Sequence, residues 1–500
     1  DDRSLGGEVF TAIMEGRAAQ SAWSSVILKH VRTFRQMDDP YLRERAADVN
    51  DLGKRVLGYL QSNDKKTAPL PRRVILVGED LSATSLADIP VDRLVGIISR
   101  KGSSNSHLAI VARALGIPTV MGAVGLPWTE LEGQELIVDG FLGDVVSGAT
   151  RSLRRRYLQR QREEKILAKD LEKLRDIPCI TADGLPFSLW VNTGLRQDTL
   201  LSLKSGAGAV GLFRTEMPFF LRSSFPTEDE QIGIYRDQLL AFAPRTVTMR
   251  TLDIGGDKDL PYFPIEEENP FLGWRGIRIS LDHPEIFLVQ IRAMLRASEG
   301  VNNLRIMLPM ISNIPELDRA VELIDRAYRE LTDEEGYCLQ KPPIGAMIEV
   351  PAAVYQVKEI GRRVDFLSVG TNDLTQYLLA VDRNNPRVAD LYSSLHPSVL
   401  RALKSIHEQA SSVNCQLSVC GEMAGDPLQA VVLMGLGYEN LSMSASSLLR
   451  VKSVLLNVTH KQAQDLVKRA LRMPDAASIA RFLAGALNQP EVARLLRLTI

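Results

Sequence analysis

From about residue 181 onward, short apolar runs alternate with stretches in which apolar residues recur at helical spacing. The candidate strands are 187–192, 209–214, 247–254, 304–310, 344–350, 365–370, 417–421 and 440–444. Strands that alternate with helices in this number predict an α/β fold with a (β/α)8 TIM barrel. A doubly wound open sheet is the structural alternative. The tail after residue 460 is predicted to be helical.

The chain up to about residue 62 has a helical pattern. Asp39 and Pro40 suit the start of a helix, with Asp as the cap and Pro in the first turn. An apolar stripe follows at helical spacing, at Leu42, Ala46, Val49, Leu52, Val56 and Leu60. A weaker helix is predicted before it, over about 15–37. Two helices cannot close a core alone, so this segment packs on something else or is half of a bundle.

Between these parts the pattern changes twice. Residues 63–71 are polar and contain proline, as in a linker. Short apolar runs at 73–78 and 94–99, a helix at 107–115 and two further runs then predict a small α/β domain that ends near Gly148. Residues 151–175 are charged and helix-prone. The predicted parts are therefore a helical segment (1–62), an α/β domain (63–150), a connecting helix (151–180) and the barrel with its tail (181–500).

Composition narrows the class of protein. The net charge of −1 over 500 residues gives no basic field that would hold nucleic acid or anionic lipid. No apolar run approaches the length that spans a bilayer. The cysteines form neither a C-x-x-C pair nor a metal-ligand pattern, which favours a reducing, cytoplasmic setting. The chain begins at Asp1 without a methionine or a signal-peptide pattern, so we expect a piece of a longer protein.

One histidine occupies a position suited to phosphate chemistry. A turn rich in Gly and Ser, residues 102–106, leads to His107 at the start of an apolar helix. A phosphoryl group on His107 would face free backbone N–H groups and the positive end of the helix dipole. Imidazole is also a competent nucleophile near neutral pH. On this stretch alone, a surface histidine near a helix cap is an equally good interpretation.

The predicted barrel adds cations at the ends of its strands. Arg214 ends one candidate strand, Arg250 lies in the next, and Arg275 and Arg383 lie on predicted loops of the same barrel face. Guanidinium groups bind phosphate and carboxylate oxygens in pairs, and each charged hydrogen bond contributes roughly 1.5–3 kcal/mol. A single arginine is more often part of a surface salt bridge. Several arginines at one barrel face favour a small, highly anionic substrate.

Three other residue types complete the candidate site. Glu349 and Asp373 follow neighbouring strands and could hold one Mg²⁺, although a salt bridge and a helix cap are the alternatives. Asn372 offers a neutral hydrogen bond to phosphate. Cys420 ends a strand and, as a thiol that is mostly protonated at neutral pH, could give a proton to an enolate. From its position alone, Cys420 is better explained as a buried core residue.

Eight strings in this sequence together resemble enzyme I of the phosphoenolpyruvate-dependent phosphotransferase systems. They are YLRERAADVNDLGKR, SNSHLAIVARALGIPTVMG, GLFRTE, TLDIGGDK, NPFLGWRGIR, IEVPAA, SVGTNDLTQY and CGEMAGDP. The resemblance implies that His107 is phosphorylated and that the arginines named above bind phosphoenolpyruvate with Asn372. It also implies Glu349 and Asp373 as Mg²⁺ ligands and Cys420 as the acid that protonates the enolate.

The nitrogen branch of this family is the most similar. LDHPEIFLVQIRAMLRA, VDRNNPRVADLY and LGYENLSMS resemble that branch rather than the sugar branch. The branch implies a small histidine-bearing carrier, NPr or HPr-like, as the phosphate acceptor, and a homodimer formed through the barrel. The GAF sensor domain of that branch and the start of the carrier-binding domain have no counterpart in this sequence.

Two other functions remain open at this stage. A pyruvate phosphate dikinase or phosphoenolpyruvate synthase shares the histidine domain and the barrel, but it needs a nucleotide-binding domain, for which the sequence offers no phosphate loop. A catalytically inactive regulatory binding protein is the third possibility. The complete set of candidate ligands argues against it.

Overall fold

The computed structural model divides into two compact units, Asp1–Gly148 and Ala149–Ile500. It describes residues 3–35, 49, 53, 56, 57, 60, 70–79, 81, 89, 90, 92–101, 108, 109, 112, 116–140, 142–194, 196–220, 222, 224–256, 258, 260, 262–385 and 387–487. Each unit is considered by itself. The four-part division expected from the sequence stays a prediction.

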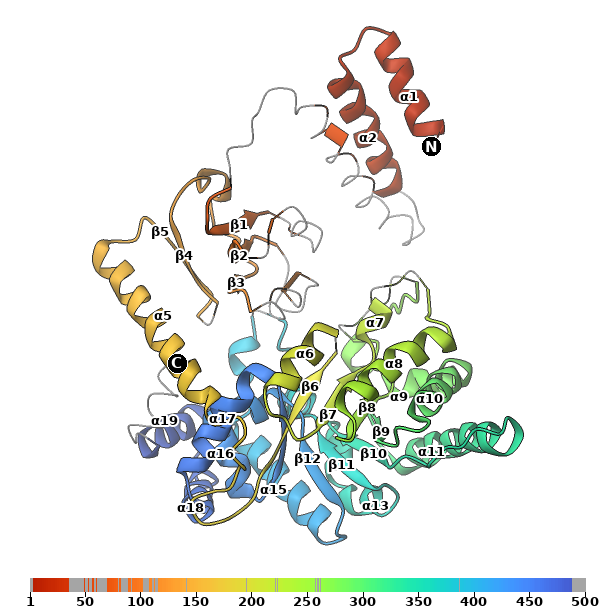
Figure 1. Ribbon diagram of the computed structural model, residues 1–500, viewed down its shortest axis with the longest axis vertical. Coiled ribbons are helices and arrows are strands. Elements are labelled where there is room, and N and C mark those ends of the chain that lie inside the picture. The colour runs from red at the N-terminus through yellow and green to blue at the C-terminus, as the bar shows by residue number, and fades with distance from the viewer. Residues whose placement is uncertain are drawn as a thin grey trace. The chain divides into compact units, whose positions relative to one another are not determined.

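The second unit is built on a closed barrel of parallel strands (Figure 1). The strands are β6 (Ser188–Thr193), β7 (Val210–Arg214), β8 (Val247–Arg250), β9 (Leu304–Leu308), β10 (Ile344–Ile348), β11 (Phe366–Val369), β12 (Gln416–Val419) and β13 (Asn440–Met443). They follow one another around the barrel in chain order, and β13 closes it by pairing with β6. Each predicted strand is confirmed, and closure decides for the barrel over the open sheet.

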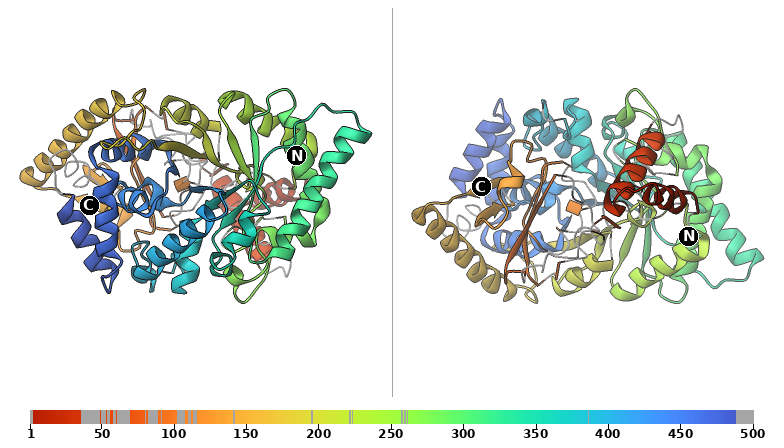
Figure 2. Two further views of the ribbon diagram at one scale, coloured as in Figure 1. Left: turned by 90° about the horizontal axis from the view of Figure 1, so that it is seen from below. Right: turned by 90° about the horizontal axis from the view of Figure 1, so that it is seen from above.

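Helices surround the strands (Figure 2). They are α6 (Arg196–Lys204), α7 (Met217–Phe220), α8 (Glu228–Phe242), α9 (Ile277–Asp282), α10 (Pro284–Ser298), α11 (Ile314–Arg329), α12 (Pro351–Val354), α13 (Val357–Gly361), α14 (Thr371–Leu379), α15 (Pro397–Ser411), α16 (Pro427–Leu436), α17 (Ala445–Asn457), α18 (His460–Ala470) and α19 (Ala476–Ala486). Capping boxes start several of them, such as Thr227 with Glu230 before α8. The predicted helical tail is confirmed by α18 and α19.

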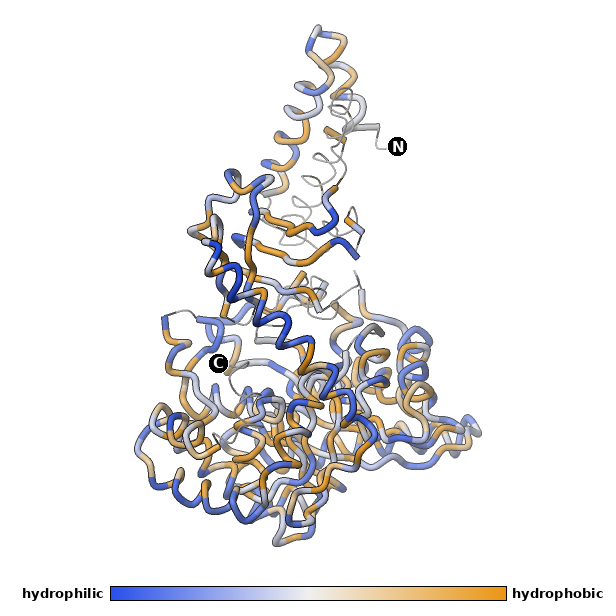
Figure 3. Tube along the Cα trace, turned by 60° about the vertical axis from the view of Figure 1, so that its left-hand side comes forward, coloured by the Kyte–Doolittle hydropathy of each residue, from blue (hydrophilic) through white to orange (hydrophobic). Residues whose placement is uncertain are grey.

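Apolar side chains pack in several clusters in the barrel unit. A large core fills the space between the strands and the surrounding helices. A smaller cluster consists of Leu212, Met307, Met347, Phe366 and Cys420. Helix α5 (Arg151–Glu172) belongs to this unit and is largely hydrophilic along its length (Figure 3). Only Leu167 and Leu171 of α5 are buried, so its last turns alone join the core.

In the first unit, the described residues give the bounds of two small sheets and two α-helices. Strands β1 (Val74–Gly78), β2 (Leu94–Ser99) and β3 (Thr119–Val120) form a parallel sheet, and β4 (Leu136–Asp139) pairs antiparallel with β5 (Asp144–Ser147). The strands predicted at 73–78 and 94–99 are thus confirmed. Leu108 is fully buried against Leu94 and Ile97. The residue after His107 therefore serves the core of this unit, which explains why it is a large apolar side chain.

Two helices begin this unit, α1 (Arg3–Met14) and α2 (Ala19–Arg35). Helix α2 confirms the helix predicted over 15–37. Most of the helix predicted from Asp39, most of the linker at 63–71 and most of the helix at 107–115 lie outside the described residues. In the part of the chain that the structure does describe, no helix is both long and apolar enough to cross a membrane.

Candidate active site

Four of the predicted site residues meet at one end of the barrel. Because the strands are parallel, their carboxyl ends share one face. Arg214 ends β7 and Arg250 ends β8, and the two are register partners. Glu349 follows β10 directly, and Cys420 follows β12. His107, the predicted phosphate acceptor, lies outside the described residues.

A buried carboxylate, Asp253, connects the cations of this face. It accepts from Arg250 Nη1 at 3.1 Å and from Arg275 Nε at 3.3 Å, and it also binds Lys258 Nζ. Burial alone would raise the pKa of Asp253, but the three cations outweigh burial and hold that pKa well below its ordinary value. Asp253 therefore stays ionised and fixes the cations in place.

A second buried carboxylate supports the same cations from β7. Glu216 Oε1 accepts from Arg250 Nη2 at 2.5 Å and lies 3.5 Å from Lys258 Nζ. Burial opposes the ionisation of Glu216, but Arg250 and Lys258 lower its pKa below the ordinary value. For Arg250 itself, burial disfavours the charge, and Glu216 and Asp253 outweigh it and raise the pKa. Arg250 is consequently a fixed, fully charged group.

Arg275 extends the network to the helix that follows β11. Its side chain is fully buried, and Nη1 donates to Asp373 Oδ1 and to the Tyr377 hydroxyl, each at 3.2 Å. Gly276 next to it has φ +58, and a Cβ there would press on Met310 and on Asp253. Glycine at 276 thus lets Arg275 reach Asp253 and Asp373 together.

Asp373 lies in the first turn of α14 and is largely buried. Burial would raise its pKa, but Arg275 and Arg383 outweigh burial and lower it. Arg383 Nη2 lies 4.0 Å from Asp373 Oδ1. The structure therefore brings the predicted residues Arg275, Asp373 and Arg383 into one cluster.

Glu349 is the carboxylate that the cations do not neutralise. It is fully buried, and its Oε1 accepts from the Met310 amide at 2.7 Å, while Oε2 has no hydrogen-bond partner. Burial, followed by the charges of Asp373 and Asp253, raises the pKa of Glu349 to about 7. An unpaired carboxylate oxygen near two other carboxylates is a suitable environment for a hard cation.

The fit to Mg²⁺ rests on two protein ligands. Glu349 and Asp373 offer oxygen donors of the kind that Mg²⁺ prefers, and Mg²⁺ usually takes only one or two carboxylates beside substrate and water. Among the residues that the structure describes, no group of three or more His, Cys, Asp or Glu side chains is placed to hold a metal. The chemistry of these two side chains therefore fits an Mg²⁺ ion that would also take ligands from substrate and water.

Cys420 lies in the small apolar cluster and is 4% exposed. Its Sγ donates to the Val369 carbonyl at 3.6 Å. Burial raises the pKa of Cys420 to about 11, so the thiol keeps its proton at neutral pH. The alternative that Cys420 is a core residue accounts for its burial, and its place directly after β12 puts it at the same end of the barrel as the arginines.

Asn372 is oriented by its neighbours. Its Oδ1 accepts from the Glu422 amide at 2.9 Å, and its backbone carbonyl accepts from the Tyr392 hydroxyl at 3.2 Å. Because the oxygen of the amide is occupied, Nδ2 is the group that can donate to an anion. This is the polarity that a phosphate ligand requires.

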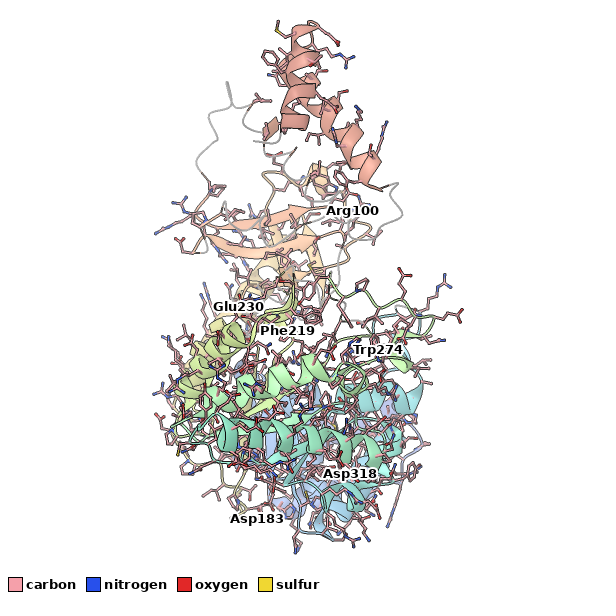
Figure 4. All side chains as sticks on the ribbon, turned by 90° about the vertical axis from the view of Figure 1, so that its right-hand side faces the viewer. Arg100, Asp183, Phe219, Glu230, Trp274 and Asp318 are labelled. Carbon is pink, nitrogen blue, oxygen red and sulfur yellow. The ribbon has the colours of Figure 1, made fainter. Side chains whose placement is uncertain are left out.

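A small aromatic core supports the chain segments that carry these residues. It includes Phe219, Phe225, Tyr262, Phe263 and Trp274, of which Phe219 and Trp274 are labelled in Figure 4. Ring pairs such as Phe225 with Tyr262 and Phe225 with Phe263 meet edge to face. The segment between β8 and α9, which holds Lys258 and Arg275, is thereby packed rather than free.

Comparison with known families gives this constellation a context. The family model described as "PEP-utilising enzyme, PEP-binding domain" matches residues 168–460, which include every barrel strand. The chain belongs to the PEP-utilising enzyme family. Models described as "PEP-utilising enzyme, mobile domain" and "PEP-utilising enzyme, N-terminal" match residues 70–143 and 1–45.

Individual PEP-utilising relatives cover nearly all of the chain. A protein of Escherichia coli strain K12 named "Phosphoenolpyruvate-dependent phosphotransferase system" is 46% identical over 496 residues, which are 99% of this chain and 66% of the relative. Its counterpart in Salmonella typhimurium is 45% identical with the same coverage. A "Phosphoenolpyruvate-protein phosphotransferase" of Staphylococcus carnosus is 37% identical over 91% of this chain and 79% of the relative. The chain thus spans about two thirds of the first two relatives.

Sequence reasoning about this PEP-utilising chain missed the carboxylates that hold the cations. Glu216 and Asp253 were not among the predicted site residues, although each follows a predicted arginine by two or three positions. That spacing at the end of a strand was the available signal. Their role became visible only when the barrel placed Arg250 and Lys258 between them.

Proposed function

We propose that this chain is a phosphoenolpyruvate–protein phosphotransferase. It takes the phosphoryl group of phosphoenolpyruvate onto His107, with Mg²⁺, and releases pyruvate. The observation that carries the proposal is the cluster at the carboxyl ends of the strands, where buried carboxylates hold arginines in place beside a protonated thiol. Such a cluster suits a small substrate with both a phosphate and a carboxylate.

Substrate binding is assigned to Arg214, Arg250, Arg275 and Arg383 with Asn372. Arg250 and Arg275 are buried and already oriented by Glu216 and Asp253, so they lose little conformational freedom when an anion arrives. Asn372 Nδ2 adds a neutral donor. This arrangement favours a dense anion over a neutral ligand.

The metal ligands in this proposal are Glu349 and Asp373. When bound, Mg²⁺ supplies positive charge for the phosphate oxygens and for the enolate that is left behind. The carboxylates themselves are prepared for a cation, because Glu349 Oε2 is buried without a partner and the pKa of Glu349 is raised to about 7.

The chemical steps balance with the residues of the chain. The bond between phosphorus and the enol oxygen of phosphoenolpyruvate breaks, and a bond forms between phosphorus and a ring nitrogen of His107. The Cys420 thiol then gives its proton to the methylene carbon of the enolate, which becomes pyruvate. The thiolate recovers a proton from water. Burial, which raises the pKa of Cys420 to about 11, keeps the proton available until the enolate forms.

The next acceptor in the proposal is a small histidine-bearing carrier protein, NPr or HPr-like, in a nitrogen-related phosphorelay. The comparisons support the choice of the nitrogen branch, which is expected to carry an additional sensor domain. The relatives with 45–46% identity are longer than the relative with 37% identity, as an additional domain would make them. A homodimer formed through the barrel is part of the same proposal.

The deciding experiment incubates the protein with Mg²⁺ and phosphoenolpyruvate and measures pyruvate and acid-labile phosphate on the protein. We expect stoichiometric label in wild type and none in His107→Ala. His460→Ala is the matched control, because His460 begins α18 in the helical tail and its backbone amide, which alanine keeps, donates to Asp183. Its label should match wild type.

The other outcomes point elsewhere. Wild-type protein that forms neither label nor pyruvate contradicts the proposal and favours a regulatory binding protein. Label from ATP instead of phosphoenolpyruvate would favour the dikinase. Loss of label on adding a carrier of the NPr or HPr kind would establish the second transfer.

A further inference from the structure

The strand pairing between β12 and β13 is the shortest in the barrel. The pairing of these strands consists of one residue pair, Val419 with Leu441, whereas β11 and β12 pair over four. Side chains supply hydrogen bonds along this seam. Asn440 Nδ2 donates to the Leu417 carbonyl at 3.0 Å, and Asn192 Nδ2 donates to the Cys420 carbonyl at 2.9 Å.

Asn192 reaches Cys420 from a strand that is not its neighbour. It lies in β6, and β13 stands between β6 and β12 in the closed barrel. Its Oδ1 accepts from the Ser442 hydroxyl at 2.6 Å, and Nδ2 makes a second, longer contact of 3.4 Å with the Ser442 carbonyl. Since Ser442 occupies the amide oxygen, the amide nitrogen must face Cys420.

The hydrogen bonds that Cys420 itself donates go to the other neighbouring strand, β11. Its backbone amide donates to the Val369 carbonyl at 3.1 Å, and its thiol donates to the same carbonyl at 3.6 Å. Gly421, which follows, has no room for a side chain, because a Cβ there would collide with Thr371. Val369 therefore holds Cys420 from β11, and Asn192 holds it from β6.

We propose that Asn192, oriented by Ser442, is a positioning residue that aims the Cys420 thiol at the carbon it protonates. This inference rests on the proposed function, because it gives Asn192 a role only in the protonation of the enolate. The pairing of β12 with β13 is recorded only at Val419, so it is the Asn192 amide that binds the Cys420 carbonyl and fixes the peptide that carries the thiol. Without this hydrogen bond, the thiol keeps its proton but is no longer held in position to protonate the carbon.

A purely structural role predicts a different result. If Asn192 only joined the seam, its loss would loosen the whole face and slow phosphoryl transfer and protonation together. A positioning role slows protonation more than transfer. The quantity that separates the two is the ratio of pyruvate formed to phosphohistidine formed in a single turnover.

The experiment measures this ratio in the full chain with Mg²⁺ and phosphoenolpyruvate. Asn192→Ala removes the donor and the acceptor. Asn192→Asp keeps an acceptor for Ser442 but cannot donate to the Cys420 carbonyl. We expect pyruvate to lag behind label about tenfold in both variants, since misplacing a reacting group by about 1 Å can cost up to about 10²-fold. Ser442→Ala should show a smaller lag.

Two comparisons make the test specific. Asn440→Ala removes the equivalent hydrogen bond at the other end of the same seam, and its ratio should equal that of wild type. Combining Asn192→Ala with Cys420→Ala should give the ratio of Cys420→Ala alone, because a residue that acts through another adds nothing once that residue is gone. Unfolding curves followed by circular dichroism establish that each variant is folded. If Asn192→Ala does not fold, Ser442→Ala takes its place in the comparison.

The outcomes are distinct. A lag in both Asn192 variants with none in Asn440→Ala supports the inference. Equal loss of label and pyruvate, or an unchanged ratio, overturns it and leaves the proposed function intact. Wild-type protein without label overturns the proposed function, and the inference with it.

Discussion

At the scale of residues, the carboxylates decide how the cations behave. Asp253 contacts Arg250, Lys258 and Arg275 and is fully buried. A buried charge is stabilised only when its partners are present, so removing one partner is more costly than the pair is stabilising. The same residue therefore orients the cations and keeps their mutual repulsion from opening the fold.

We predict that Asp253→Asn lowers the free energy of unfolding by about 3–5 kcal/mol, because three cations lose a shared carboxylate inside the protein. Asp318→Asn is the control. Asp318 pairs with Arg363 at 3.0 Å on the surface, and both side chains are about half exposed, so its loss should cost less than about 1 kcal/mol. Urea titrations of the two variants and wild type measure the difference. Equal midpoints would contradict the argument.

The pKa of Cys420 gives a second prediction at this scale. Burial raises that pKa to about 11. The thiolate is the form that reacts with iodoacetamide. As long as the pH is below the pKa, the fraction of thiolate rises about tenfold for each unit by which the pH increases. We therefore expect the rate of alkylation of Cys420, followed by mass spectrometry of its peptide, to rise about tenfold per unit between about pH 8 and about pH 10. If the alkylation rate instead reached a plateau near pH 9, the pKa of Cys420 would be that of an ordinary thiol and the prediction would be wrong. Cys338, which is exposed, should react first.

At the scale of elements, a chain of buried polar side chains connects the outer helices to the site. Gln290 in α10 accepts from the Leu252 amide at 2.8 Å and donates to Thr215 Oγ1 and to the Tyr235 hydroxyl, each at 3.1 Å. Thr215 in turn donates to the Arg250 carbonyl at 2.7 Å. Helix α10 thereby holds the ends of β7 and β8 in register.

We predict that Gln290→Leu destabilises the fold by about 1–3 kcal/mol, because the Leu252 amide is left buried without a partner. It should also raise the KM for phosphoenolpyruvate, since Arg250 loses support through Thr215. Ser298→Ala in the same helix removes only a local bond to the Leu295 carbonyl and should change KM little. Steady-state kinetics and thermal unfolding of both variants test this. If the KM of Gln290→Leu stays at the wild-type value, α10 does not support the substrate site.

Elements were more predictable from the sequence than their contacts. Each barrel strand stands out because it is a short apolar run between helical stretches, and residues such as Arg250 and Glu349 are recognisable because they end such runs. Asn192 had no comparable signal, because a polar residue in a strand indicates no partner. Only closure of the barrel, which brings β6 beside β13, places Asn192 near Cys420. The role of His107 stays a prediction.

At the scale of the whole molecule, the chain joins two units that each have a core. The barrel unit is closed by its own strands and filled by an apolar cluster that runs from Leu167 to Leu487. The unit that precedes it has a smaller core around Leu94, Ile97 and Leu108. In the proposed function, substrate is bound by one unit and the phosphoryl group is received by the other. The covalent connection between the units then sets the effective concentration of the receiving unit at the substrate site.

This division leads to a prediction about the separated units. Residues 149–500 should fold alone and bind phosphoenolpyruvate with Mg²⁺, as measured by calorimetry, because every proposed substrate and metal ligand lies in that unit. It should form no phosphohistidine. When residues 1–148 are added, label should appear at a rate proportional to protein concentration, whereas the rate in the intact chain should be independent of concentration. A covalent tether commonly acts like a concentration on the order of millimolar, so micromolar mixtures of the pieces should label on the order of 10³-fold more slowly than the intact chain. If the mixed pieces and the intact chain are labelled at equal rates, the units associate tightly without their covalent connection. If residues 149–500 fail to bind phosphoenolpyruvate, part of the substrate site lies in residues 1–148.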